Sequence, residues 1–281
     1  MFRYGISAGM DDLPAKQPVT LRGDMETICR QAKEIGYDAV ELHVREPGRY
    51  DPALLRATAE KFGLKICAVA NGMEYTVNGL CLIDPNEDAR RAAFDRFIQH
   101  VDFCGELGAM CVSGIMRGNI PPSADREAVM RRFTDSTRKI CEYAAKKHVR
   151  VVIESIMRYI NNYLNSVPET IDWVVSTGID NLGLHLDTHS MAVEERDPAA
   201  SIRYCQGKPL GYVHYSDNNR MYPGGGAVDF KALTRALVDI GYDGYITQES
   251  TALPSPYESA RRGYEYMTSI EKAARIEALP Y

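Results

Sequence analysis

The sequence has no apolar run of about 18 residues or more, no close cysteine pair and no surplus of positive charge. A membrane-crossing helix needs about 20 apolar residues, so we expect no membrane partner. The seven cysteines are an odd number without the spacing of a disulfide framework, which favours free thiols in a reducing compartment. The first residues, MFRYGISAGMDD, lack the charged and then apolar pattern of a leader. These absences predict a cytoplasmic protein.

The charge balance is acidic, with 33 lysines and arginines against 38 aspartates and glutamates, and a net charge of −5. A protein that binds nucleic acid over a broad surface presents a basic face to the phosphates. The composition therefore argues against a nucleic-acid partner. It remains compatible with a small acidic substrate, because a single arginine can bind one whatever the net charge.

Short apolar runs alternate with longer amphipathic runs along all 281 residues. The apolar runs predict strands at residues 2–7, 38–43, 64–70, 109–114, 150–154, 182–187, 211–215 and 244–249. The amphipathic runs predict helices at residues 24–36, 51–62, 86–107, 123–148, 168–177, 199–206, 229–240 and 257–275. Eight strand-helix units without a linker predict an α/β fold of one domain, residues 1–281, closed as a (β/α)8 TIM barrel. An open doubly wound sheet has the same alternation but gathers its functional residues at one switch point.

The last four predicted strands each end in a side chain that can bind a metal ion, namely Glu154, Asp187, His214 and Glu249. Their spacings are 33 residues (154 to 187), 27 (187 to 214) and 35 (214 to 249), close to the roughly 30 residues of one strand-helix unit. A single acidic residue at a strand end more often caps a loop or forms an ion pair. Four such residues in consecutive units favour a metal centre.

The ligand types indicate the chemistry. Oxygen and nitrogen ligands without a thiolate suit Mn²⁺, Co²⁺, Mg²⁺ or Fe²⁺ better than a structural zinc ion, and three carboxylates in one pocket repel one another unless a cation lies between them. Such a cation polarises a carbonyl group and acidifies the neighbouring carbon-hydrogen bond. Because Glu154 and Glu249 come from different strands, one can remove a proton from a bound substrate while the other returns one.

The seventh predicted strand carries the pattern His-x-x-Asp-Asn-x-Arg, followed by Pro-Gly-x-Gly-x-x-Asp-Phe; its residues are His214, Asp217, Asn218, Arg220, Pro223, Gly224, Gly226, Asp229 and Phe230. This pattern resembles that of the xylose-isomerase-like TIM-barrel superfamily, and within it the D-tagatose and D-psicose 3-epimerase group. The resemblance implies a Mn²⁺ or Co²⁺ ion held by Glu154, Asp187, His214 and Glu249. It also implies that the two glutamates invert carbon 3 of a ketose through an enediolate, and that the enzyme is a homodimer or homotetramer.

Two segments depart from the family pattern. The fifth-strand motif Glu-Pro-Leu-Asn-Arg-Tyr-Glu is replaced by Glu-Ser-Ile-Met-Arg-Tyr-Ile, so Ile160 stands where the family has a carboxylate that contacts substrate. After the sixth strand the family's substrate-contacting histidine aligns with Ser190, one position after His189. We therefore expect a retained metal centre and an altered sugar or keto-acid pocket. The residues expected to contact substrate are Arg220, His189, Ser190, Asp217 and Arg158.

Other interpretations use the same ligands. One is an aldose-ketose isomerase, and another is a metal-dependent dehydratase of a keto-cyclitol or a dehydroshikimate-like compound. A third is a nuclease of the apurinic-endonuclease type, but it needs further histidines on the second to fourth strands. A sugar-binding barrel without catalysis is the remaining alternative. Glu41 and His43 can line the pocket or form an ion pair, and His185 can pack in the barrel interior or support a metal ligand.

Overall fold

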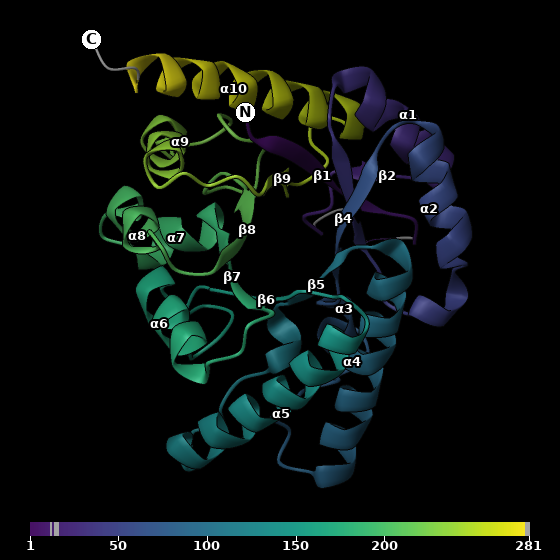
Figure 1. Ribbon diagram of the computed structural model, residues 1–281, viewed down its shortest axis with the longest axis vertical. Coiled ribbons are helices and arrows are strands. Elements are labelled where there is room, and N and C mark those ends of the chain that lie inside the picture. Colours follow the sequence, from purple (N-terminus) through teal and green to yellow (C-terminus); the bar gives the residue numbers. More distant parts are fainter. Residues whose placement is uncertain (12, 14–16, 279–281) are drawn as a thin grey trace.

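The computed structural model describes residues 1–11, 13 and 17–278, and its centre is a closed ring of parallel strands surrounded by helices (Figure 1). The ring consists of β1 (Arg3–Gly9), β3 (Ala39–His43), β4 (Lys65–Ala70), β5 (Met110–Ser113), β6 (Val151–Glu154), β7 (Leu182–Asp187), β8 (Leu210–Tyr215) and β9 (Tyr245–Gln248). Each strand pairs with the next, and β9 pairs with β1 to close the barrel. A short strand, β2 (Leu21–Arg22), pairs with the end of β1. The predicted TIM barrel is confirmed.

Helices follow the strands around the outside of the ring. They are α1 (Met25–Ile35), α2 (Pro52–Lys61), α4 (Glu87–Leu107), α5 (Arg126–Lys146), α6 (Val167–Thr177), α8 (Pro198–Tyr204), α9 (Phe230–Asp239) and α10 (Pro256–Glu277). The loops after the strands add α3 (Met73–Thr76), α7 (Thr188–Glu194) and two 3₁₀ turns, Pro47–Arg49 and Ile115–Arg117. The sequence prediction missed α3 and α7. It also began α5 too early, because the side chain of Asp125 accepts the N–H of Ala128 and so sets the first turn.

The strands separate two cores. Outward-facing residues such as Val40, Val69 and Val213 pack against the helices in the larger core. Inward-facing residues, mostly small, form a second cluster inside the barrel: Ala39, Cys67, Ala68, Ala70, Val112, Val152 and Tyr212. Residues of a strand alternate between these two sides. Polar side chains at the carboxyl ends of the strands therefore lie above an apolar barrel interior.

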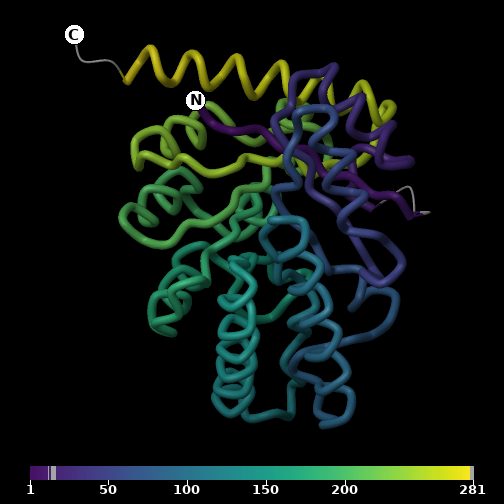
Figure 2. The backbone as a smooth tube through the Cα atoms, turned by 45° about the vertical axis from the view of Figure 1, so that its right-hand side comes forward, coloured from purple at the N-terminus to yellow at the C-terminus, as the bar shows by residue number. Residues whose placement is uncertain are grey.

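Hydrogen bonds connect the start of β1 to α10. Glu271 on α10 accepts the backbone N–H of Phe2 at 2.7 Å and the hydroxyl of Tyr4 at 3.0 Å. In Figure 2 the amino end accordingly lies beside α10, while α4 and α5 run side by side away from it. Among the described helices none is both long and apolar enough to span a membrane.

Candidate metal centre and active site

The carboxyl ends of β6 to β9 bring the four predicted ligands to one face of the barrel. Glu154 and Asp187 are the last residues of β6 and β7, and Glu249 directly follows β9. His214 on β8 is the register partner of Asp187. Asp187, His214 and Glu249 are buried, and Glu154 lines an open cavity. The strand register thus places these four residues at one face of the barrel, and their role as metal ligands stays a prediction.

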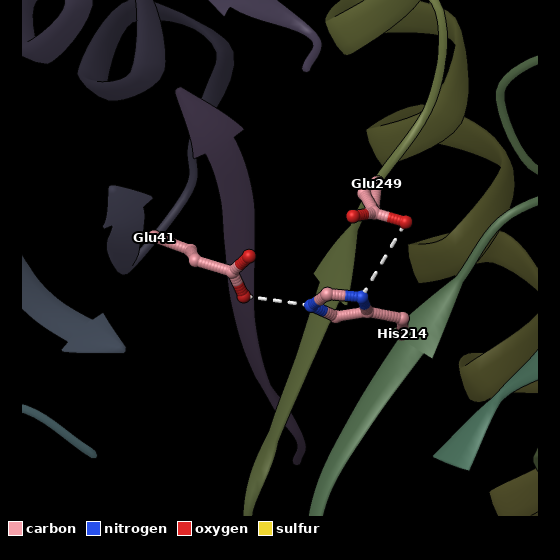
Figure 3. Close-up of side chains that lie close together, drawn as sticks. All are labelled: Glu41, His214 and Glu249. Carbon is pink, nitrogen blue, oxygen red and sulfur yellow. Dashed lines mark hydrogen bonds and ion pairs between the residues drawn. The ribbon is translucent and has the colours of Figure 1, made fainter. Parts of the chain in front are cut away.

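His214 lies between two carboxylates, as Figure 3 shows. Its Nε2 donates to Oε2 of Glu41 at 2.6 Å. Its Nδ1 lies 3.7 Å from Oε2 of Glu249, too far for a hydrogen bond, and has no hydrogen-bond partner among the described residues. Two ligand atoms that share a metal at about 2 Å lie roughly 3 to 4 Å apart. The donor set, the buried free Nδ1 and this separation therefore fit a divalent ion beside Nδ1.

Glu41, at the end of β3, is the carboxylate that holds the His214 ring. It also accepts the hydroxyl of Tyr212, and Nε2 of His43 lies 2.9 Å from its Oε1. Burial alone would raise the pKa of Glu41, but the neighbouring His214 and His43 hold it well below its usual value. Glu41 and Glu249 in turn raise the pKa of His214 well above its usual value. The hydrogen bond to Glu41 keeps one ring proton on Nε2, so a metal ion would displace the proton of Nδ1, the nitrogen that faces Glu249. Of the roles the sequence left open for Glu41, the structure supports the buried ion pair.

His185 lies behind His214, inside the barrel. The two rings are edge to face, with centroids 4.1 Å apart. In the part of the chain that the structure describes, neither nitrogen of His185 has a hydrogen-bond partner. Burial, together with the charge of His214, holds the pKa of His185 well below its usual value. A neutral ring in this position packs against His214 and restricts its tilt.

Two of the four predicted ligands belong to the tightest cluster. In the described chain, ligand atoms of Glu41, His214 and Glu249 all lie within 4.8 Å of one another. Asp187 and Glu154 lie outside that cluster. Asp187 is linked to it by Arg220, whose Nη1 lies 3.3 Å from Oδ2 of Asp187 and donates to Oε2 of Glu249 at 2.8 Å. One guanidinium group therefore supplies positive charge to two of the expected metal ligands.

Glu154 and Glu249 have opposite electrostatic environments. Burial, with the charges of Asp187 and Glu249, raises the pKa of Glu154 to about 8. Burial alone would also raise the pKa of Glu249, but His214 and Arg220 lower it to about 2. Two carboxyl groups in one site with separated pKa values are typical of an acid and base pair.

Gly114 makes room for the carboxylate of Glu154. A Cβ atom at Gly114 would lie 2.7 Å from Oε2 of Glu154, closer than such contacts occur. The absence of a side chain at the end of β5 therefore lets Glu154 turn into the cavity.

The carboxylate of Asp217 is hydrogen-bonded to the loop that follows β8. Its carboxylate accepts four backbone N–H groups at 2.8–3.1 Å, from Asn218, Gly224, Gly226 and Val228. It therefore fixes the glycine-rich loop in place. The substrate contact predicted for Asp217 stays a prediction, since its lone pairs already have these partners.

The other predicted substrate contacts have protein partners as well. His189 donates from Nδ1 to the carbonyl of Asp217 at 3.0 Å, and the hydroxyl of Ser190 donates to Asp187 at 3.4 Å. Arg158 is exposed and forms a bidentate pair with Glu194, at 2.8–3.1 Å. Neither Arg158 nor His189 lines the cavity that Glu154, His214 and Glu249 share. Arg220 is the one predicted contact that lines it.

A cavity of about 300 Å³ opens beside these groups, a size that suits a small metabolite. Its polar wall includes His43, Glu154, His214, Arg220 and Glu249, and its apolar wall consists of Pro18, Ala70, Met73, Val112, Ile115, Ile156 and Ile160. Ile160, which stands in place of the family's carboxylate, is thus part of the cavity. Asn71, which the sequence analysis did not select, also lines it. The only signal for Asn71 was its position directly after a predicted strand.

Comparison with known proteins gives a family match over most of the chain. Residues 29–270 match the family model described as "Xylose isomerase-like TIM barrel". An L-ribulose 3-epimerase of Mesorhizobium japonicum is 29% identical over 231 residues, which cover 82% of this chain and 76% of that protein. An L-ribulose 3-epimerase of a Methylomonas species is 30% identical over 231 residues, 78% of this chain and 76% of that protein.

The solved structures agree on the fold. A structure of an L-ribulose 3-epimerase superposes with a TM-score of 0.87 and covers 99% of this chain and 97% of that chain. The sequence identity in that superposition is 22%, so the likeness establishes a shared fold.

Proposed function

This chain belongs to the xylose isomerase-like TIM barrel family, and from that premise we propose that it is a metal-dependent ketose 3-epimerase. The observation that carries the proposal is geometric: Glu154, Glu249 and His214 line one cavity, and Nδ1 of His214 has no hydrogen-bond partner among the described residues. L-ribulose 3-epimerases among its relatives carry out a reaction that needs an acid and base pair such as two glutamates.

Glu154, Asp187, His214 and Glu249 are the residues proposed to hold the divalent ion. When bound, that ion supplies the Lewis acidity that makes the carbon-hydrogen bond beside a ketone acidic. Mn²⁺ is the proposed ion, with Co²⁺, Mg²⁺ and Fe²⁺ as alternatives, because the set is rich in oxygen and has no thiolate. Arg220 now pairs with Asp187 and Glu249. A bound ion would supply that positive charge instead, which would allow the guanidinium group to bind substrate oxygens.

The two glutamates perform the proton transfers. A carboxylate at Glu249 takes the proton from carbon 3 of the ketose, and the electron pair passes into the neighbouring carbonyl to give an enediolate. Glu154, acting as the acid, returns a proton to the opposite face of carbon 3. Carbon 3 is then inverted, Glu249 carries a proton and Glu154 is ionised. The opposite epimer can therefore react by the same steps in reverse order.

The decisive experiment is solvent exchange in deuterium oxide with MnCl₂. L-ribulose, D-psicose, D-tagatose and D-fructose are each incubated with the enzyme, and deuterium at carbon 3 is followed by NMR. We expect deuterated product of inverted configuration from at least one ketose. Exchange should fall at least about 10³-fold in Glu154→Gln and Glu249→Gln, since each loses one proton-transfer group.

Measuring the metal content of the variants distinguishes the two proposed roles of these glutamates, metal binding and proton transfer. If the variants keep manganese, measured by mass spectrometry, yet lose exchange, the residues act as acid and base. The matched control is Glu106→Gln, at an exposed glutamate on α4, which should exchange at the wild-type rate. Full exchange in both active-site variants would contradict the mechanism.

Three further properties are part of the proposal. A cytoplasmic location is supported by the seven cysteines, all of which are unpaired, as expected for a reducing compartment. A homodimer or homotetramer follows from the family pattern, and sedimentation velocity would test it. The proposed substrate contacts remain Arg220, His189, Ser190, Asp217 and Arg158, of which Arg220 lines the cavity.

A further inference from the structure

Asn71 is a buried amide without a hydrogen-bond partner. It directly follows β4, its exposed fraction is 0%, and neither its side-chain oxygen nor its nitrogen has a partner in the described chain. Nearly all buried polar groups in proteins are hydrogen-bonded, so an amide with both ends free needs an explanation. Asn71 is one of the residues that line the cavity, together with Glu154, His214 and Glu249.

The side-chain amide of Asn71 forms no hydrogen bond with the neighbouring described backbone. An asparagine just before a helix usually accepts a backbone N–H from the first turn. The cap position of α3 is instead Gly72, which makes no side-chain hydrogen bond. Asn71 contributes only its backbone carbonyl, which accepts the N–H of Glu74 at 3.0 Å. The side chain therefore has no evident role in stabilising α3.

The position of Asn71 in the ring is opposite the histidine of the metal centre. From β4, four steps around the barrel in either direction lead to β8, which carries His214. Glu154 on β6 lies halfway along one of these paths. A substrate whose reacting end lies between Glu154 and Glu249 would thus extend its other end toward Asn71.

The surroundings of Asn71 specify the chemistry of that end. Its neighbours in the cavity wall include Ala70, Met73 and Val112, which offer no side-chain hydrogen bond and no charge. Among the described residues of this wall the only lysine or arginine is Arg220, which lies beside Asp187 and Glu249, at the reacting end of the proposed substrate. A neutral donor and acceptor side by side match two adjacent hydroxyl groups rather than a phosphate.

We propose that Asn71 is a substrate-binding residue whose side-chain oxygen and nitrogen bind two neighbouring hydroxyl groups of an unphosphorylated ketose, beyond the reacting carbon. This inference rests on the proposed function. It adds a specificity-determining residue that supplies, on the far wall, polar contacts that Ile160 does not provide.

The test compares Asn71→Leu with Asn78→Leu. Leucine has nearly the shape of asparagine, so Asn71→Leu removes two unpaired polar atoms and should leave the melting temperature unchanged or raised. Its kcat/KM for the best ketose of the solvent-exchange panel should fall about 10- to 100-fold, mainly through KM. Asn78 is the structural contrast because it donates to the buried Glu74 at 2.8 Å and lies outside the cavity wall. Asn78→Leu should lower the melting temperature and keep the wild-type kcat/KM.

Deoxy analogues of the same ketose, lacking one hydroxyl at carbon 4, 5 or 6, identify the contact. The wild type should disfavour at least one analogue about 10-fold or more, and Asn71→Leu should lose that preference. The inference would be overturned if Asn71→Leu kept the wild-type kcat/KM and the wild-type preference among the deoxy analogues. It would also be overturned if the melting temperature of Asn71→Leu fell as far as that of Asn78→Leu.

Binding separates failure of this inference from failure of the proposed function. If the wild type exchanges no ketose, calorimetry with the four panel ketoses decides. Binding by the wild type that is lost in Asn71→Leu would support the site without epimerisation, and equal binding by both would overturn it. A wild type that binds none of the four would overturn both proposals.

Discussion

At the scale of single residues, the state of one imidazole decides whether the site can bind a metal. A metal ligand must be a deprotonated ring nitrogen, and the tautomer of a histidine depends on the hydrogen bond that its other nitrogen makes. In His214 that other nitrogen is Nε2, and its acceptor is the buried carboxylate of Glu41. Tyr212 holds Glu41 in turn from β8 itself. A carboxylate on β3 therefore prepares a ligand on β8.

We predict that Glu41→Gln lowers the affinity for Mn²⁺ about 10- to 100-fold, because the neutral amide no longer fixes the ring and its tautomer. Isothermal titration with MnCl₂ on metal-free protein measures this. Glu106→Gln, at an exposed position, should bind as the wild type does. An unchanged affinity in Glu41→Gln would mean that His214 is oriented by its packing against His185 alone.

At the scale of elements, the loop between β8 and α9 depends on one buried carboxylate. Asp217 accepts N–H groups from both ends of the glycine-rich segment, including Gly224 and Val228. Gly226 must also lack a side chain, because a Cβ atom there would lie 2.4 Å from Oδ1 of Asp217. The carbonyl of Asp217 accepts from His189 after β7, so the same residue links the loops after two strands.

We predict that Asp217→Asn destabilises the protein by about 2–4 kcal/mol, because an amide nitrogen replaces an acceptor that faces backbone N–H groups. Urea unfolding gives the stability, and faster hydrogen exchange at Gly224, Gly226 and Val228 would locate the effect. The control is Asp180→Asn at an exposed turn, which should stay within about 0.5 kcal/mol of the wild type. Equal stability of the two variants would contradict this role of Asp217.

At the scale of the whole molecule, stability should depend on a buried pair between α3 and α4. Glu74 on α3 and His100 on α4 are both fully buried, with Nε2 of His100 3.3 Å from Oε1 of Glu74. Burial lowers the pKa of His100 below its usual 6.5, although Glu74 opposes that shift. Burial alone would raise the pKa of Glu74, but hydrogen bonds from His100, Asn78 and Arg96 lower it below its usual 4.5.

Both shifts act in the same direction. A group whose pKa is lower in the folded protein is protonated more readily in the unfolded chain, so stability rises with pH across the interval between the two values. The contribution of His100 is therefore complete above pH 6.5 and is lost as the pH falls through its folded value. The contribution of Glu74 is complete above pH 4.5 and is lost at lower pH.

We predict a lower urea midpoint at pH 5 than at pH 7, with part of the difference removed in His100→Gln, which cannot take up a proton. His148→Gln is the matched control, since His148 is exposed at the end of α5 and should leave the pH dependence unchanged. If His100→Gln and wild type lost the same stability between pH 7 and pH 5, the buried histidine would not be the source.

The local order of this protein follows from its sequence. Strand and helix periodicity are properties of neighbouring residues, and the eight strands lie within two residues of the predicted ranges. The positions of Glu154, Asp187, His214 and Glu249 at successive strand ends also follow, because parallel strands present their carboxyl ends at one face. The start of α5 and the presence of α7 were not predicted, since each depends on which of several nearby polar side chains caps the turn.

Only the tertiary structure decided which partners these side chains have. Glu41 and His214 are 173 residues apart, and no sequence periodicity predicts that Nε2 of His214 lies 2.6 Å from Oε2 of Glu41. The guanidinium of Arg220 between Asp187 and Glu249, and the unpaired amide of Asn71, are likewise outcomes of packing around the ring. A hydrogen bond depends on distances of a few tenths of an ångström, which side-chain rotamers and strand register set together once the barrel has closed.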